Sequence, residues 1–219
     1  MTDCSFSGGA VFFDLDGTLL DTIPLIVESY QHTFRDFFGN PGNQADILAG
    51  IGLPLDDLFR NSWPEQAEAM KAVYLQHNHA RLDTHIAIFR EVPVMLERLR
   101  QLKIPMGIVT SKGQYSAMRS LRFFDLEHYF QIFIVKESTL LHKPNPEPLY
   151  EGMQQMRIDD PARVVYVGDS LHDLLCAKRA GCHSAIVDWT AMPREQLLAA
   201  DPDLWLTETE ELVDYFKNL

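Results

Sequence analysis

The amino-acid sequence predicts an α/β fold, a doubly wound parallel sheet of Rossmann-like type, with a small α-helical cap domain inserted near its start. Short apolar runs rich in β-branched residues recur along the chain, and helix-patterned stretches separate them. Such alternation is typical of a parallel sheet that helices cover on both faces. A long helical stretch without strand patterning follows the first apolar run, and this stretch predicts the insertion.

Five segments are expected to form the buried strands of the sheet. The first is GGAVFFDLDGT, an apolar run that ends abruptly in acidic residues and glycine, as a buried strand leading into a loop does. The others, in chain order, are IPMGIVTS, QIFIVKES, RVVYVGDS and HSAIVDWT. The amphipathic segment EVPVMLERLRQL precedes the second strand and is expected to be the helix that returns the chain to the sheet.

Residues 22–87 are predicted to form the cap domain, and residues 1–21 and 88–219 the core domain. The inserted stretch has helical periodicity throughout and contains no convincing strand. A chain of 219 residues fits one core with a modest insertion better than two independent domains. The domain boundaries are therefore expected at the two places where the chain enters and leaves the insertion.

The cap is expected to contain at least three helices. The first has Thr22 as its N-cap, carries apolar side chains at helical spacing and ends at Gly39. The second begins at Leu55, after the segment GIGLP. The third opens at Ser62, which has the spacing of a capping box with Glu65.

The formal charge of −12 restricts the partners of the protein. Nucleic acids and anionic membranes demand a surplus of Lys and Arg, so neither is expected as a partner. An anionic small molecule is still compatible with this charge, because a bound divalent cation can dominate the local potential of an acidic protein.

Cysteine usage and the N-terminal segment indicate the compartment. Cys4, Cys176 and Cys182 show no CxxC spacing, which indicates free, buried thiols in a reducing compartment. The start, MTDCSFSGGA, lacks the layout of a signal peptide, and no apolar run approaches the roughly 18 residues of a membrane span. We therefore expect a cytoplasmic protein.

Two aspartates stand at the end of the first predicted strand. Asp14 and Asp16 are two residues apart, so in an extended chain their side chains point the same way. Two carboxylates on one face repel each other, and a bound divalent cation is the commonest remedy. The alternative is an aspartate-rich turn after a strand. Gly17 would allow a sharp turn, and Thr18 could bond back to an aspartate.

A second acidic pair follows the strand RVVYVGDS. Asp169 ends this strand, and Asp173 lies one helical turn further on. The carboxyl ends of parallel strands face one crevice, so Asp169 can converge with Asp14 and Asp16. Asp173 has an equally good alternative role, because its spacing from Ser170 resembles a capping box.

Hydroxyl and ammonium groups complete the candidate set. Thr110 and Ser111 end the strand of MGIVTS and offer donors at the same carboxyl edge. Lys143 lies in HKPNPEPLY, where prolines restrict the backbone. In isolation Lys143 is best interpreted as an exposed lysine. Beside clustered carboxylates it would instead balance charge and bind phosphate oxygens.

Taken together, four segments resemble the four motifs of the haloacid dehalogenase superfamily, in order. They are DLDGT, the Thr of VTSK, the Lys of HKPNPEP, and GDSLHD. The resemblance covers nearly the whole chain. It implies that Asp14 is the nucleophile and Asp16 the general acid and base. It also implies that Mg²⁺ is bound by Asp14, by the backbone carbonyl of Asp16 and by Asp169, with Asp173 in support.

The same resemblance assigns the phosphoryl group to Thr110 and Lys143, which count with Asp14 and Asp16 as the catalytic residues. Ser111 is a further candidate for substrate binding. A carboxylate nucleophile splits hydrolysis into two easier displacements, and cations neutralise the phosphoryl oxygens. Dehalogenases of the superfamily lack a carboxylate at the place of Asp16, since a leaving halide needs no proton. A phosphate compound is therefore the expected substrate.

The position of the cap, between the first and second motifs, resembles the phosphoglycolate phosphatase and β-phosphoglucomutase branch. The segment AGIGLPLDDLF resembles phosphoglycolate phosphatases and a related group of bacterial inorganic pyrophosphatases. The resemblance to the pyrophosphatase group extends to YLQHNHARLDTH and VDWTAMPREQL. This implies hydrolysis of a small phosphorylated metabolite or of pyrophosphate. A phosphosugar mutase and a non-catalytic binding protein are the alternatives. Substitutions at 53–57 are expected to change substrate preference.

Other polar residues are weaker candidates. His77, His79 and His85 could meet an anionic substrate, but their spacing argues against a zinc pair, and a solvated helix surface is the favoured interpretation. Lys112 and Arg119 are possible anion contacts for which an exposed surface position is again favoured. A monomer or a homodimer is expected.

Overall fold

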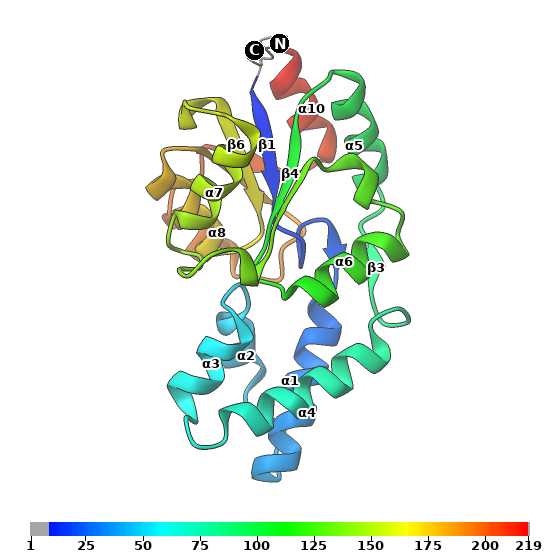
Figure 1. Ribbon diagram of the computed structural model, residues 1–219, viewed down its shortest axis with the longest axis vertical. Coiled ribbons are helices and arrows are strands. Elements are labelled where there is room, and N and C mark those ends of the chain that lie inside the picture. The colour runs from blue at the N-terminus through cyan, green and yellow to red at the C-terminus, as the bar shows by residue number, and fades with distance from the viewer. Residues whose placement is uncertain (1–8, 219) are drawn as a thin grey trace.

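A six-stranded parallel sheet forms the centre of the computed structural model, which describes residues 9–218 (Figure 1). The strand order is β5-β4-β1-β6-β7-β8. This arrangement confirms the predicted fold class. The strands, in chain order, are β1 (Ala10–Phe13), β4 (Met106–Val109), β5 (Ile132–Ile134), β6 (Val164–Gly168), β7 (His183–Val187) and β8 (Leu204–Leu206).

Side chains of β1 alternate between two hydrophobic clusters, one on each face of the sheet. Val11 and Phe13 pack with α5 (Val92–Gln101), α6 (Gln114–Phe123) and α10 (Thr209–Lys217). Ala10 and Phe12 pack with α7 (Glu147–Met156) and α8 (Leu171–Ala180). Both faces of β1 are therefore buried, as expected for the central strand of a doubly wound sheet. The remaining short helices are α9 (Arg194–Ala199), η1 (Glu127–Tyr129), η2 (Lys136–Ser138) and η3 (Pro161–Arg163).

Four helices lie beyond the carboxyl edge of the sheet and pack on one another (Figure 1). They have a hydrophobic cluster of their own, in which the ring of Tyr30 lies 5.6 Å from that of Phe59 and 4.8 Å from that of Tyr74. The helices are α1 (Ile23–Phe38), α2 (Gln44–Gly50), α3 (Leu55–Ser62) and α4 (Ala67–Arg81). We refer to them as the cap.

A short antiparallel pair stands where the chain passes between sheet and cap. Strand β2 (Leu20–Asp21) pairs with β3 (Ala87–Ile88). The sequence did not indicate these strands, because two residues carry no readable alternation. Their position is compatible with the domain boundaries drawn at residues 22 and 87, and the division into two domains stays a prediction.

The expected start and end of the first cap helix are confirmed. Thr22 is the N-cap of α1, and Gly39 ends it with φ 71°, a left-handed conformation that glycine adopts without strain. The start of α3 at Leu55 is confirmed as well. The segment EVPVMLERLRQL also forms the predicted helix, as α5.

The start predicted for the third cap helix is wrong. Ser62 is the last residue of α3, and α4 begins at Ala67 without a side-chain cap. Pro64 explains the break, because the residue before a proline avoids helical backbone angles. Trp63 therefore leaves the helix, and its ring packs 5.3 Å from that of Phe38. Helix α2 and strand β8 were not expected, since both are short.

Cys176 and Cys182 are free and buried, as expected, and Cys4 lies outside the described residues. Within residues 9–218 no helix is both long enough and apolar enough to cross a membrane.

Candidate active site

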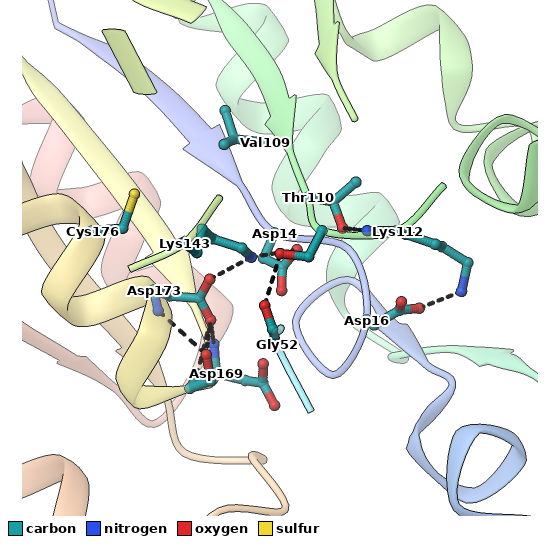
Figure 2. A network of polar contacts seen from close by, with 12 residues as sticks. Asp14, Asp16, Gly52, Val109, Thr110, Lys112, Lys143, Asp169, Asp173 and Cys176 are labelled. Carbon is teal, nitrogen blue, oxygen red and sulfur yellow. Dashed lines mark hydrogen bonds and ion pairs between the residues drawn. The ribbon is translucent and has the colours of Figure 1, made fainter. Parts of the chain in front are cut away.

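The candidate residues gather at the carboxyl edge of the sheet, facing the cap (Figure 2). Asp14 follows β1, Thr110 follows β4, and Asp169 follows β6. Lys143 comes from the loop before α7 and reaches the same place. Parallel strands place their carboxyl ends together, which is why residues far apart in the sequence meet here.

Lys143 is buried between two carboxylates (Figure 2). Its Nζ lies 3.1 Å from Oδ1 of Asp14 and 2.6 Å from Oδ1 of Asp173. Burial lowers the pKa of the ammonium group, but the two carboxylates outweigh burial and raise the pKa above its ordinary value. With 2% of its surface exposed, Lys143 is not the surface lysine that its local sequence favours.

Asp173 forms the capping box that its spacing resembles, and it also lies beside Asp14 and Asp169. Its Oδ2 accepts hydrogen bonds from the backbone N–H and the hydroxyl of Ser170, at 3.0 and 2.6 Å, which completes the capping box of α8. Its Oδ1 faces Lys143 and accepts a 3.0 Å hydrogen bond from the Tyr166 hydroxyl. Burial opposes ionisation of Asp173, yet the Lys143 ammonium and these hydrogen bonds lower its pKa.

At Asp14 and Asp169 the effect of burial outweighs the compensation by Lys143. Burial raises the pKa of Asp14 to about 6, although the charge of Lys143 opposes this shift. Burial, followed by the charges of Asp173 and Asp14, raises the pKa of Asp169 well above its ordinary value. Burial thus disfavours ionisation of these two carboxylates, and a further positive charge beside them would favour it.

The donor set and the charge at this edge fit a divalent cation. Oxygens of Asp14, Asp169 and Asp173 lie within 4.8 Å of one another, and all three residues are buried. Three carboxylates and the single ammonium of Lys143 leave a charge of −2, which one divalent ion would neutralise. Hard carboxylate oxygens are the ligands that Mg²⁺ prefers.

The side chain of Asp16 lies apart from this acidic group (Figure 2). Its Oδ1 accepts hydrogen bonds of 2.7 Å from Lys112 Nζ and from Thr22 Oγ1. The side chain of Lys112 is 8% exposed, so the surface position favoured for it is wrong. The hydroxyl of Thr18 has no hydrogen-bond partner, so Thr22 rather than Thr18 bonds to the aspartate.

Thr110 and Ser111 lie at the end of β4 with different partners. The Thr110 hydroxyl is buried and accepts a 3.3 Å hydrogen bond from the backbone N–H of Lys112. The Ser111 hydroxyl donates a 2.7 Å hydrogen bond to the carbonyl of Gly52 in the cap. Thr110 is therefore part of the carboxyl edge, whereas Ser111 connects core and cap.

Three other candidates are engaged elsewhere. His77 is buried and stacks on His32, so the solvated surface expected for it is wrong. His79 makes a 2.9 Å hydrogen bond with Ser116. Arg119 forms a 2.7 Å ion pair with Asp83.

Tyr166 and Thr190 are functional candidates that the sequence did not reveal. The Tyr166 hydroxyl lies 2.8 Å from the Val109 carbonyl oxygen and 3.0 Å from Asp173 Oδ1, and its one proton is shared between these acceptors. Thr190 donates a 2.6 Å hydrogen bond to the carbonyl of Asp169. A tyrosine inside an otherwise aliphatic strand is a signal of a buried hydroxyl that needs a partner. Thr190 gave no comparable signal.

A cavity of about 170 Å³ separates the carboxyl edge from the cap. Asp14, Asp16 and Asp169 line its core side, and Tyr74 and Asn78 of α4 line its cap side. The volume suits a small molecule, and both parts of the chain contact whatever fills it.

Gly17 provides a test of the carboxylate geometry. Its φ is +79°, and a Cβ atom on it would lie 2.3 Å from Oδ2 of Asp169. We expect Gly17→Ala to displace Asp169 and reduce turnover at least about tenfold, and to lower the free energy of unfolding by about 1 to 3 kcal/mol. Steady-state rates and urea unfolding measure the two effects.

Gly39→Ala is the matched control for this substitution. Gly39 has a similar φ of +71°, but a Cβ atom there meets nothing within 4 Å. The free energy of unfolding of Gly39→Ala should fall by a similar amount, because alanine is strained at this left-handed φ, while turnover stays at the parent level. Equal turnover in both variants would show that the close approach of Gly17 to Asp169 does not position the carboxylate.

The chain belongs to the haloacid dehalogenase-like hydrolase family, whose model matches residues 11–187. This match confirms the family and the enzyme class that the four motifs indicated.

Individual proteins resemble the chain over nearly its full length. Pyrophosphatase PpaX from Halalkalibacterium halodurans is 34% identical over 204 residues, which cover 93% of this chain and 94% of that protein. A haloacid dehalogenase-like hydrolase from Streptococcus pneumoniae has a TM-score of 0.82 at 25% identity, covering 95% and 98% of the two chains. A predicted phosphoglycolate phosphatase from Haemophilus somnus has the same TM-score at 21% identity, covering 95% and 97%, and shows the fold alone.

Proposed function

We propose that the protein is a Mg²⁺-dependent phosphohydrolase that acts through an aspartyl phosphate on a small phosphate ester or on inorganic pyrophosphate. The observation that carries this proposal is the carboxyl edge itself. The Asp14 carboxylate is held by Lys143, stands among excess buried carboxylates, and faces a small cavity. The similarity to pyrophosphatase PpaX supports pyrophosphate as one of the two substrates considered.

In the first step, an Asp14 oxygen attacks phosphorus and the bond from phosphorus to the leaving oxygen breaks. Lys143 orients the carboxylate and neutralises phosphoryl oxygens, and Thr110 donates a hydrogen bond to them. Mg²⁺, held by Asp14, Asp169 and the Asp16 carbonyl with Asp173 in support, would supply the remaining positive charge when bound.

In the second step, water attacks the phosphorus of the aspartyl phosphate and the bond to the Asp14 oxygen breaks. Asp16 gives a proton to an alkoxide leaving group in the first step and takes one from this water in the second. Its carboxylate is oriented by Lys112 and Thr22, which fix the Oδ1 atom from two sides. This leaves Asp16 positioned independently of the acidic group.

Phosphate release tests the proposal. The purified chain should release phosphate from phenyl phosphate, phosphoglycolate or pyrophosphate only with added Mg²⁺. Product analysis with glucose 1-phosphate separates hydrolysis from isomerisation. If none of a large set of phosphate compounds released phosphate, the proposed hydrolase activity would be refuted.

The buried free thiols support our further proposal of a cytoplasmic location. A monomer or homodimer stays a prediction from the sequence.

A further inference from the structure

Two lysines meet one carboxylate at the cap side of the cavity. Lys71 Nζ lies 2.8 Å from Oδ1 of Asp56, and Lys136 Nζ contacts Oδ2 of the same carboxylate. Asp56 and Lys71 belong to α3 and α4 of the cap, whereas Lys136 opens η2 in the core. All three residues line the cavity that Asp14 faces, and we call them the Asp56 cluster.

The Asp56 cluster retains one positive charge. Burial raises the pKa of Asp56, but the hydrogen bonds and charges of Lys136 and Lys71 outweigh it and hold the pKa below its usual range. One carboxylate is thus shared by two ammonium groups. The side chain of Asp56 is 8% exposed, while those of Lys71 and Lys136 are 29% and 22% exposed and can reach the cavity.

Two other charged side chains that line the cavity near this cluster have partners of their own. Lys112 is paired with Asp16. Glu137 accepts a 2.8 Å hydrogen bond from the backbone N–H of Gln114, at the start of α6. Among the described residues no ion pair joins Glu137 to Lys71 or Lys136, so these two lysines share the carboxylate of Asp56 as their partner.

Connecting the cap to the core does not require two lysines. Arg119 of the core and Asp83, which follows α4, make such a connection with one cation and one anion, and neither residue lines the cavity. The pair of Lys136 and Asp56 would do the same without Lys71. A connection between cap and core therefore does not explain why Lys71 is present or why the Asp56 cluster lines the cavity.

We propose that the Asp56 cluster binds a second anionic group of the substrate, carried by the leaving group, while the transferred phosphoryl group lies at Asp14. This inference rests on the proposed function and narrows its substrate class. The substrate is a phosphoanhydride such as pyrophosphate, or an ester whose leaving group bears a carboxylate, and not a neutral sugar phosphate. Asp56 keeps the two ammonium groups together and shares them with the entering anion.

Lysine-to-glutamine variants test the subsite. With Lys71→Gln and Lys136→Gln, the KM for pyrophosphate should rise about tenfold each, the loss expected for one charge-assisted hydrogen bond. The kcat/KM for phenyl phosphate, whose leaving group has no second anion, should change less than about twofold. Lys103→Gln, at an exposed lysine, is the matched control and should leave both substrates unaffected. Thermal melting shows whether each variant is folded.

The pattern over three substrates decides the outcome. A rise in KM for pyrophosphate alone identifies the second group as a phosphoryl group, and an equal rise for phosphoglycolate extends the subsite to carboxylates. Equal losses on phenyl phosphate, or unchanged KM values on both anionic substrates in folded variants, would overturn the proposal.

A binding measurement separates failure of the subsite from failure of the hydrolase. Methylenediphosphonate has two phosphoryl groups and no hydrolysable bridge, and methylphosphonate has one. Calorimetry should show that both lysine variants bind methylenediphosphonate about tenfold more weakly and methylphosphonate equally well. If the parent bound methylenediphosphonate about tenfold more tightly than both variants but hydrolysed no phosphate compound, the subsite would stand and the proposed function would be refuted. Equal weakening for both ligands would refute the subsite.

Discussion

Replacing Asp14 by asparagine should reduce turnover on every phosphate compound by roughly 10⁴-fold or more. The neutral amide is a poor nucleophile, and it also removes a charge from the acidic group with Asp169 and Asp173. Steady-state phosphate release measures the loss. Asp36→Asn, at an exposed aspartate of α1, is the matched control and should retain parent activity.

Asp16→Asn should behave differently and trap the phosphoenzyme. With phenyl phosphate activated by a nitro group, the leaving group needs no proton, so the first transfer to Asp14 proceeds. No base then remains to activate water, and the aspartyl phosphate accumulates. Asparagine retains a side-chain oxygen that can accept the hydrogen bonds of Lys112 and Thr22, so the local structure should persist.

A burst of product followed by slow turnover is the expected record for Asp16→Asn. Acid-quenched protein should be about 80 Da heavier on a peptide that contains Asp14, the mass of one retained phosphoryl group. Parent turnover of Asp16→Asn on an alkyl phosphate would refute the role of Asp16. A label on another peptide would refute the role of Asp14.

Removal of Mg²⁺ should reduce turnover at least about a hundredfold while the fold persists. The carboxyl edge holds three buried carboxylates against one ammonium, so without the cation it cannot neutralise phosphoryl oxygens. The hydrophobic clusters of sheet and cap do not include these residues, so circular dichroism should change little. Calcium should substitute poorly, because its larger and looser oxygen shell misplaces the nucleophile.

Excess chelator followed by added Mg²⁺ is the control, and it should restore the parent rate. Undiminished turnover in excess chelator would contradict the magnesium assignment. Loss of the circular dichroism signal together with activity would show that the cation maintains the fold instead.

Hydrophobic periodicity and helix-ending residues in the sequence predicted the central elements, because the burial of apolar side chains determines where these elements form. Strand β1 is buried on both faces, and its apolar run is uninterrupted. Helix α1 has both its stripe and its glycine stop in the sequence. The missed elements are β2, β3, β8 and α2, which are short, and β2 and β3 also pair with each other from distant parts of the chain. Ser62 was misassigned because capping-box spacing is local, whereas the end of α3 depends on Pro64.

The site shows the same division between local pattern and distant partner. Asp14 and Asp169 were predicted to meet because both stand at the ends of parallel strands, and the resemblance to the four motifs added Lys143. Local sequence could not show that Lys112 is buried against Asp16, because that contact spans 96 positions. Nor could it show that Lys136 and Asp56 meet across 80 positions. The first contact depends on how the chain packs within the core and the second on how the cap packs against the core, and no local motif encodes either.

The strands β2 and β3 form a narrow connection between the core and the cap. They pair through two residues each, and the helices beyond them carry a separate hydrophobic cluster. A rotation at this short pair would have to break the polar contacts between cap and core. Ser111 with Gly52, Lys136 with Asp56, and Arg119 with Asp83 are such contacts. Ionic strength weakens ion pairs more than apolar packing, so added salt should weaken the Lys136–Asp56 and Arg119–Asp83 pairs between cap and core.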